Sequence, residues 1–143
     1  MGAATLIFSG GATSAGQPEP KPLPRELQRT LRVGQSIRFD ENLWVTFVKV
    51  SSDSRCPMNA RCIWAGDAEV VLFVKVGLRP PEVVTLHTNE DPRNVVLSAL
   101  PDGMVGIPKS YIMTLRQLTP QPVTWHQLSQ REYRLTLGFS TAL

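Results

Sequence analysis

Residues 132–139 read Glu132-Tyr133-Arg134-Leu135-Thr136-Leu137-Gly138-Phe139, with a large apolar side chain at every second position. Successive side chains of a β-strand point to opposite faces of its sheet, so this period of two predicts a strand with one dry face and one solvated face. The residues expected on the dry face are Tyr133, Leu135, Leu137 and Phe139. Such one-sided strands are typical of antiparallel sheets.

Similar patterns recur along the chain and predict further strands. We expect them over residues 33–39, 43–50, 67–76, 82–88 and 110–118, with residues 67–88 forming a hairpin and residues 51–66 a long loop. Residues 43–50 are apolar on both faces, which predicts a central strand buried on two sides. Glycine and proline turns separate these segments, so we predict an all-β antiparallel β-sandwich or barrel of about six to eight strands.

Composition excludes several classes of protein. The chain has 143 residues, which suits one domain around a single core. A hydrophobic fraction of 42% excludes a wholly disordered chain, and 12 prolines with 10 glycines argue against long helices and coiled coils. The net charge is +3, but the basic residues are scattered and form no block that could track phosphates. Nucleic-acid binding is therefore not expected.

The N-terminal sequence predicts three segments. Residues 1–16 carry no charge and contain an apolar run followed by small residues. This order resembles the second half of a signal peptide, so the segment is a possible truncated signal peptide. The alternative is a flexible tail. Residues 17–30 begin with proline at every second position and predict an extended, proline-rich linker. Residues 31–143 are expected to form the β domain. No run approaches the about 20 apolar residues of a membrane span, so we expect no transmembrane segment, and peripheral anchoring stays open.

Cys56 and Cys62 are the only cysteines in the sequence. An even count in a chain with a signal-like N-terminus predicts one disulfide and a secreted or periplasmic location. Closing so short a loop is expected to contribute about 2 kcal/mol by restricting the unfolded chain. The alternative is a pair of reduced, buried thiols.

The two cysteines lie within a motif. Asp53-Ser54-Arg55-Cys56-Pro57 leads into the loop, and Cys62-Ile63-Trp64-Ala65-Gly66 leads out of it. This motif resembles the signature of a family of uncharacterised bacterial secreted proteins and lipoproteins, and the resemblance extends over residues 33–35, 43–50 and, more weakly, 111–122. It implies a strand on either side of the loop and a location in the bacterial cell envelope, but no activity. No lipobox cysteine stands beside the N-terminal apolar run.

Physical chemistry predicts an ordered crossover between two strands here. Asp53 is expected to pair with Arg55, which contributes about 0–1 kcal/mol if the pair is exposed. Gly66 is expected to take a positive φ, and Trp64 to stack over the disulfide or cap the core. The candidate binding residues are Asp53, Arg55, Arg61 and Trp64.

We expect a non-enzymatic binding or structural module of the bacterial cell envelope, with a protein or glycan as partner and no cofactor. The leading alternative is a serine protease inhibitor that inserts the disulfide-tied loop 53–64 with Arg61 or Arg55 exposed, because rigidity lowers the ordering cost of binding. Another is a small-molecule or metal-binding protein, since Cys56, Met58 and Cys62, if reduced, are soft ligands for monovalent copper. An exposed Trp44, Trp64 or Trp125 is suited to binding a glycan or an envelope protein.

The ionisable residues give little support to catalysis. His87 and His126 are the only histidines, and neither has a His, Cys or acidic residue at zinc-ligand spacing. The sequence contains no Gly-x-Ser-x-Gly elbow and no phosphate-binding glycine loop. We therefore predict no catalytic residues and no metal site, with both histidines as ordinary surface or edge residues.

Overall fold

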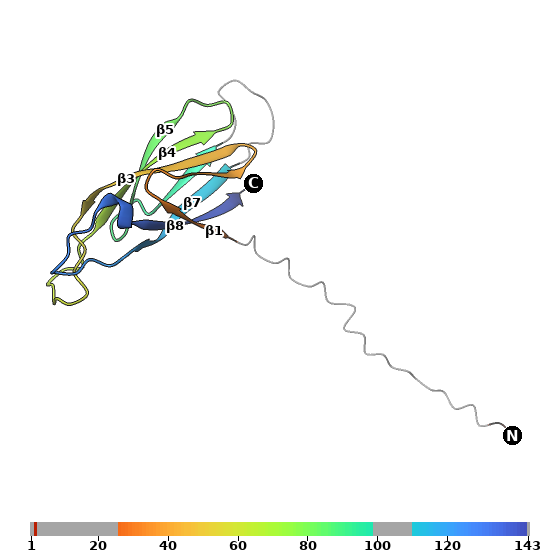
Figure 1. Cartoon of the computed structure of the whole chain (residues 1–143). Coiled ribbons are helices and arrows are strands. Elements are labelled where there is room, and N and C mark those ends of the chain that lie inside the picture. The colour runs from red at the N-terminus through yellow and green to blue at the C-terminus, as the bar shows by residue number, and fades with distance from the viewer. Residues whose placement is uncertain (1, 3–25, 99–109, 143) are drawn as a thin grey trace.

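The computed structural model describes residues 2, 26–98 and 110–142. Within these ranges two four-stranded antiparallel sheets pack as a β-sandwich, with one short 3-10 helix and no α-helix (Figure 1). The all-β prediction is confirmed. The elements are β1 (Leu27–Arg32), β2 (Ser36–Asp40), β3 (Leu43–Asp53), β4 (Ala68–Val76), β5 (Glu82–His87), β6 (Asn94–Ser98), β7 (Ser110–Thr119), the 3-10 helix η2 (Gln130–Glu132) and β8 (Arg134–Ala142).

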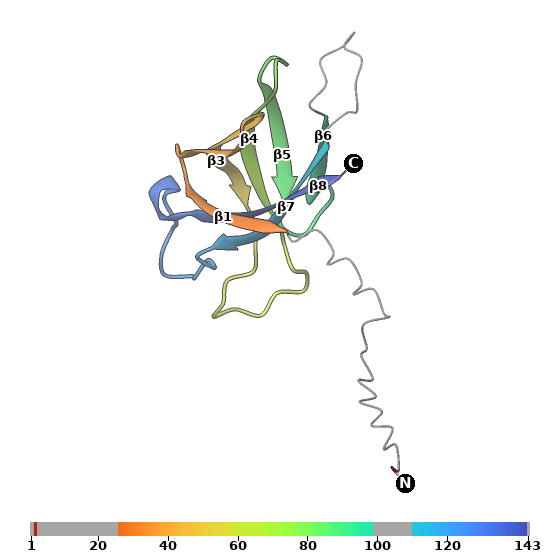
Figure 2. The same cartoon turned by 90° about the vertical axis from the view of Figure 1, so that its right-hand side faces the viewer.

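The strand order distinguishes a sandwich from a barrel. Sheet A has the order β1-β8-β7-β6, and sheet B has the order β2-β3-β4-β5. Sheet B is a simple meander, and the chain crosses between the sheets twice, from β1 to β2 and from β5 to β6 (Figure 2). No ladder joins the two sheets within the described residues, so the fold is an open sandwich.

The core lies between the sheets and follows the alternation of the sequence. The predicted dry face of the last strand is buried, and every second residue of β4 from Ala68 to Val76 is buried as well. Phe39 of β2 stacks on Phe139 of β8 at 4.8 Å between ring centroids and meets the Tyr111 ring edge-on at 5.9 Å. These aromatic contacts join sheet B to sheet A.

The predicted two-sided burial of residues 43–50 is wrong. Leu43, Val45 and Phe47 are fully buried, but Trp44 and Lys49, on the other face of β3, are exposed. The reason is the two-layer architecture: within the described residues, nothing packs on the outer face of sheet B. Strand β3 also continues to Asp53, so the predicted loop begins three residues later than expected.

Strand β1 lies partly in the segment predicted as a linker. It begins at Leu27 and pairs with β8 from Leu27 opposite Phe139 to Arg32 opposite Arg134. Leu31 is its only buried residue, so hydrogen bonds to β8 hold this edge strand, and its sequence carries a weak hydrophobic period. Apart from Gly2, the predicted signal segment, residues 1–16, lies outside the described residues, and so does most of the predicted linker. No helix in the described part of the chain has the length and hydrophobicity to cross a membrane.

Phe139→Ala tests the aromatic contact between the sheets. We expect the free energy of unfolding to fall by about 3–5 kcal/mol, because the substitution leaves a cavity beside Phe39. Val96→Ala removes an exposed side chain from edge strand β6 and should change it by less than about 0.5 kcal/mol. Urea denaturation measures both values, and similar losses in the two variants would count against this core.

Candidate binding site at the loop end of the sandwich

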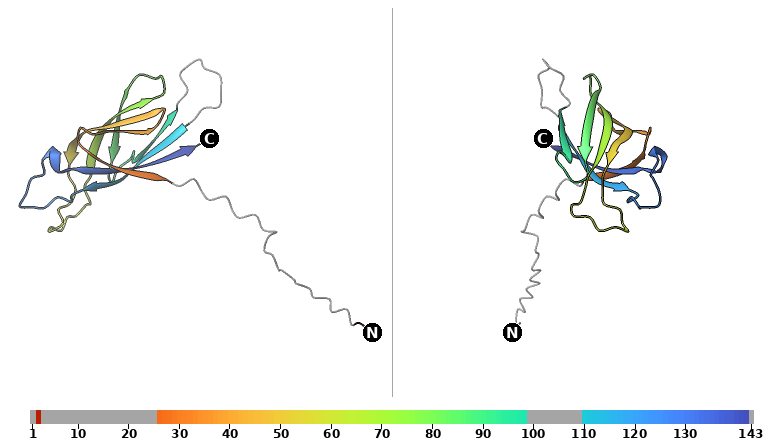
Figure 3. Two further views of the ribbon diagram at one scale, coloured as in Figure 1. Left: turned by 45° about the vertical axis from the view of Figure 1, so that its right-hand side comes forward. Right: turned by 90° about the vertical axis from the view of Figure 1, so that its left-hand side faces the viewer.

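Three connections lie at one end of the sandwich, which we call the loop end: residues 54–67, 88–93 and 120–133. They join β3 to β4, β5 to β6 and β7 to β8. The first and the last project furthest from the sheets (Figure 3). The first, residues 54–67, contains both cysteines of the motif, and we call it the cysteine loop.

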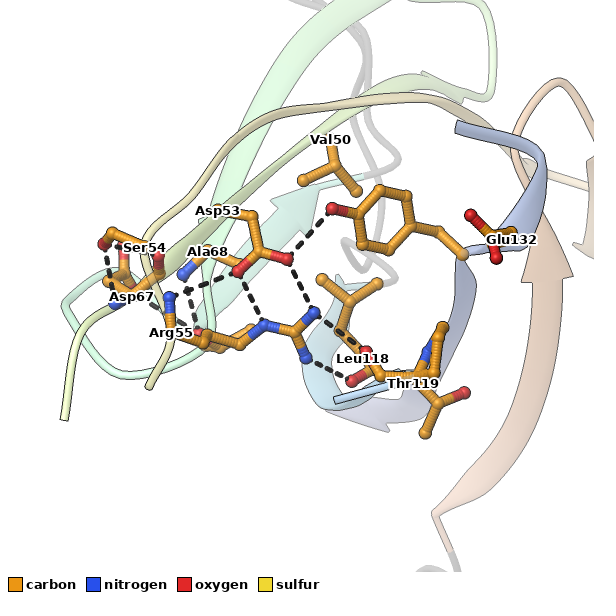
Figure 4. A network of polar contacts seen from close by, with 12 residues as sticks. Val50, Asp53, Ser54, Arg55, Asp67, Ala68, Leu118, Thr119 and Glu132 are labelled. Atoms are coloured by element: carbon orange, nitrogen blue, oxygen red, sulfur yellow. Dashed lines mark hydrogen bonds and ion pairs between the residues drawn. The ribbon is translucent and has the colours of Figure 1, made fainter. Parts of the chain in front are cut away.

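A polar network fixes the start of the cysteine loop. The Arg55 guanidinium donates from Nε to Asp53 Oδ1 at 2.8 Å and from Nη2 to Asp53 Oδ2 at 2.7 Å (Figure 4). It also donates to the carbonyls of Leu118, at 2.7 Å, and Pro120, at 3.0 Å. The predicted pair is therefore present, but the side chains of Arg55 and Asp53 are only 8% and 12% exposed, so solvent screens it far less than an exposed pair.

Tyr133 completes this network, which we call the Asp53 cluster (Asp53, Arg55 and Tyr133). Its hydroxyl donates to Asp53 Oδ2 at 2.9 Å. Burial raises the pKa of the Asp53 carboxyl, but hydrogen bonds from Arg55 and Tyr133 and the charge of Arg55 lower it by more, so that pKa lies below its ordinary value. Burial and the Asp53 carboxylate raise the pKa of Tyr133 to about 12. The cluster ties the end of β3 in sheet B to β7 and β8 in sheet A.

The disulfide and a short backbone ladder close the cysteine loop. Cys56 and Cys62 are joined with their Cα atoms 5.9 Å apart, as predicted. The Ser54 N–H donates to the Asp67 carbonyl at 2.7 Å, so the pairing of β3 and β4 extends beyond the strands. Gly66 has the expected positive φ, of 70°, and a Cβ there would collide with the Ser54 carbonyl. Because both thiols are consumed, the copper hypothesis loses its thiolate ligands.

The cysteine loop is also held against the β7–β8 connection. The Asn59 side chain donates from Nδ2 to Thr124 Oγ1 at 2.5 Å and accepts the Thr124 N–H at 3.0 Å. The Met58 N–H donates to the Pro122 carbonyl at 2.9 Å. Sequence reasoning missed this contact, because the partners are more than 60 residues apart and carry no local signal.

Large apolar side chains on these loops face solvent. Ile63 is 94% exposed and Trp64 is 73% exposed, and Met58 and Trp125 are similarly open. The prediction that Trp64 caps the core is therefore wrong, because Val50, Leu118 and Tyr133 already close this end of the core. The loop end thus presents apolar groups, with Arg61 exposed among them.

The candidate binding residues separate into two groups. Asp53 and Arg55 lie within the network and support the loop, whereas Arg61 and Trp64 are exposed on it. Arg55 is engaged by four hydrogen-bond contacts to Asp53, Leu118 and Pro120, so it cannot enter the pocket of a trypsin-like protease. Of the two arginines considered for protease inhibition, only Arg61 is exposed and available to enter such a pocket.

Both histidines have carboxylate partners that sequence reasoning missed. His87 Nδ1 lies 2.6 Å from Asp67 Oδ2, and His126 Nε2 lies 2.7 Å from Glu132 Oε1. Asp67 and His87 are 20 residues apart in sequence and meet because β4 pairs with β5. Among the described residues, no hydrogen bond joins either ring to a hydroxyl or a thiol.

Asp67 anchors the β5–β6 connection. Its Oδ1 accepts the N–H groups of Asn89, at 2.8 Å, and Glu90, at 3.2 Å. Burial raises the pKa of Asp67, but the hydrogen bonds from His87, Asn89 and Glu90 lower it by more. Ligand atoms of Asp67, His87 and Glu90 lie within 4.8 Å of one another, which a metal ion could use. Both Asp67 oxygens, however, already serve these loop contacts, so a structural anchor explains the arrangement.

Comparisons with protein-family models, curated proteins and solved structures found no match to this chain. The chemistry of the loop end is therefore inferred from its own side chains. These are large, apolar and exposed, and they stand on backbone that a disulfide and hydrogen bonds to the neighbouring loop hold in place.

Arg55→Met leaves the shielded Asp53 carboxylate without its cation. We expect the free energy of unfolding at pH 7 to fall by about 3 kcal/mol, because removing one partner of a buried ion pair costs about 3–5 kcal/mol. Arg61→Met makes the same change at an exposed position of the same loop and should shift it by less than about 0.5 kcal/mol. Urea denaturation provides both measurements.

The loss in Arg55→Met should also depend on pH. The folded pKa of Asp53 lies below its unfolded value of about 3.9, so the wild-type pair stabilises the fold above that pH and loses its contribution as the pH falls through the lowered pKa. The difference between wild type and Arg55→Met should therefore shrink below about pH 4. A difference that stays constant with pH contradicts this account.

His87 should titrate above its ordinary pKa of 6.5, because its hydrogen bond to Asp67 outweighs the opposing effect of burial. The contribution of the charged pair to stability is then complete below pH 6.5 and is lost as the pH rises through the raised pKa. An NMR titration of the His87 ring measures that pKa directly. In Asp67→Asn it should fall, while Glu41→Gln, on the β2–β3 turn, should leave it unchanged.

Proposed function

We propose that this protein is a non-enzymatic binding module of the bacterial cell envelope that recognises a protein partner through its loop end. The observation that carries the proposal is the exposure of Ile63 and Trp64, 94% and 73%, directly after Cys62, the second cysteine of the disulfide. Large apolar groups held open to water favour association, because covering them removes apolar surface from solvent.

The composition of the loop end matches that of a protein interface. Trp, Met and Arg are enriched at interfaces, and Trp and Arg dominate the residues whose loss weakens binding most. Trp64 and Arg61 belong to one loop, and Trp125 belongs to the loop hydrogen-bonded to it.

Rigidity favours this use of the loop. Ordering a flexible side chain on binding costs about 0.5–1.5 kcal/mol, and ordering the backbone adds to it. Here the disulfide, the Asp53 cluster and the Asn59–Thr124 contact fix the backbone before any partner arrives. The motif thus contains two kinds of residue. Asp53, Arg55 and the two cysteines hold the loop in place, whereas Ile63 and Trp64 are exposed on it.

A location outside the cytoplasm is part of the proposal. The disulfide supports it, because reducing compartments keep thiols free. The signal-like N-terminal sequence and the resemblance of the cysteine motif to bacterial secreted proteins and lipoproteins point the same way. The proposed location is therefore secreted or periplasmic.

A double variant, Ile63→Ser with Trp64→Ser, tests the loop end. We expect its affinity for envelopes isolated from the source bacterium to fall at least about tenfold, the scale of losing two exposed interface anchors. Leu78→Ser is the matched control, because Leu78 is 81% exposed on the β4–β5 turn, at the opposite end of the sandwich. Co-sedimentation of purified protein with envelopes measures the bound fraction.

Three results would count against the proposal. The first is wild-type protein that sediments with no envelope fraction. The second is a loop variant that binds as wild type does, and the third is a Leu78→Ser variant that loses as much binding as the loop variant. Pretreating the envelopes with protease should abolish the binding that depends on the loop, because the proposed partner is a protein. Binding that survives protease identifies a different class of partner.

A further inference from the structure

The outer face of sheet B carries a second candidate site, away from the loop end. Trp44 and Phe73 are each about half exposed there, on neighbouring strands β3 and β4. With Thr46, Lys75 and Pro81 they line a groove of about 420 Å³. Small-ligand sites are typically concave, mostly apolar and about 300–1,000 Å³ in volume, so the groove has the size and lining of such a site.

The strand register arranges this face in two rows across the sheet. Arg38 of β2 pairs with Trp44 of β3, which pairs with Lys75 of β4. In the next row Thr46 of β3 pairs with Phe73 of β4. Trp44 and Phe73 are therefore diagonal neighbours, about 7–8 Å apart, a separation at which both aromatic rings can contact one extended ligand.

Two cationic side chains lie at the groove. The Arg38 guanidinium lies over the Trp44 ring, 5.4 Å from its centroid, and Lys75 is directly across the ladder from Trp44. Across the described residues, neither cation is paired with a carboxylate. Two cations beside an aromatic floor favour a ligand with negative charge.

Asp40 and Glu41 follow Arg38 closely in sequence, but among the described residues neither forms an ion pair with Arg38 or Lys75. The Asp40 carboxylate instead accepts the Asn42 N–H and the Tyr111 hydroxyl.

Two further acidic residues lie on or beside the strands of the groove. Glu69 lies on the same face of β4, but six residues from Lys75, which is about 20 Å along a strand. Glu82 follows Pro81 in sequence, but it pairs with Val74, whose side chain points into the core, so Glu82 is on the opposite face of the sheet. The cations Arg38 and Lys75, unpaired among the described residues, therefore favour a ligand that carries negative charge.

We propose that the groove binds an acidic saccharide, with sugar rings against Trp44 and Phe73 and a carboxylate near Arg38 and Lys75. A sugar ring has an apolar face of C–H groups, which suits the face of an aromatic ring, and a polar edge, which suits the Thr46 hydroxyl and the two cations. A carboxylated saccharide combines the apolar face and the negative charge that this lining requires.

The site is independent of the loop end. Lys75 lies near the end of β4, and the cysteine loop joins that strand at its start, at Ala68. The two regions are thus separated by nearly the full length of β4, so substitutions in one leave the other intact. An experiment can therefore disprove the saccharide site without affecting the proposed function, and the proposed function can be disproved without affecting the saccharide site.

Purified full-length protein should be titrated by calorimetry with hexagalacturonate, which is acidic, and with maltohexaose, which is neutral. We expect hexagalacturonate to bind at least about fivefold more tightly at low salt, and this preference to fade at high salt as charges are screened. Trp44→Ala should weaken the binding of hexagalacturonate by about tenfold or more. Trp125→Ala removes an exposed tryptophan from the loop end and should change it by less than about twofold.

Lys75→Gln provides a second variant that keeps the aromatic floor. It should reduce the preference for hexagalacturonate over maltohexaose while leaving maltohexaose binding within about twofold of wild type. The proposal is overturned if hexagalacturonate does not bind, if Trp44→Ala binds it as wild type does, or if Trp125→Ala loses as much as Trp44→Ala. Equal affinity of wild type for both saccharides overturns the assignment of an acidic ligand.

Discussion

The Arg55 guanidinium is almost shielded from water, and a shielded cation is stable only where its donors all find acceptors. Asp53 supplies two of these acceptors from the end of β3, and the carbonyls of Leu118 and Pro120 supply two more from the end of β7. Because these groups belong to different sheets, satisfying one side chain fixes how the sheets meet at this end. The same requirement fixes the path of the chain as it leaves β3.

Further contacts hold the rest of the cysteine loop, beyond the segment that Arg55 fixes at the end of β3. The backbone ladder continues past the strands to Ser54 and Asp67, the disulfide closes the loop, and Asn59 attaches its tip to Thr124. Each contact removes freedom from backbone that presents exposed apolar side chains. Within one short motif, therefore, some residues stabilise the loop, whereas their neighbours, Ile63 and Trp64, are exposed to solvent, where the proposed partner would contact them.

A two-layer fold also explains where a second surface lies. Each sheet has one face against the core, and within the described residues no further layer covers the outer face of sheet B. The exposed face of β3 and β4 nevertheless carries Trp44 and Phe73, although polar residues would serve solubility better there. Aromatic groups beside the cations Arg38 and Lys75 have a chemical use on such a face, as contacts for a ligand that is both apolar and charged.

The sequence by itself determined the strands whose inner and outer faces differ, because a period of two is written locally in residues such as those of β4 and β8. It also limited the disulfide to one possible pairing, since there are two cysteines, and the structure shows that this bond is formed. Only the tertiary structure decided that Arg55 is shielded, that Trp64 is exposed and that His87 meets Asp67. These facts depend on strand register and on partners 20 to 65 residues away, and no local pattern of side chains encodes which distant groups the folded chain brings together.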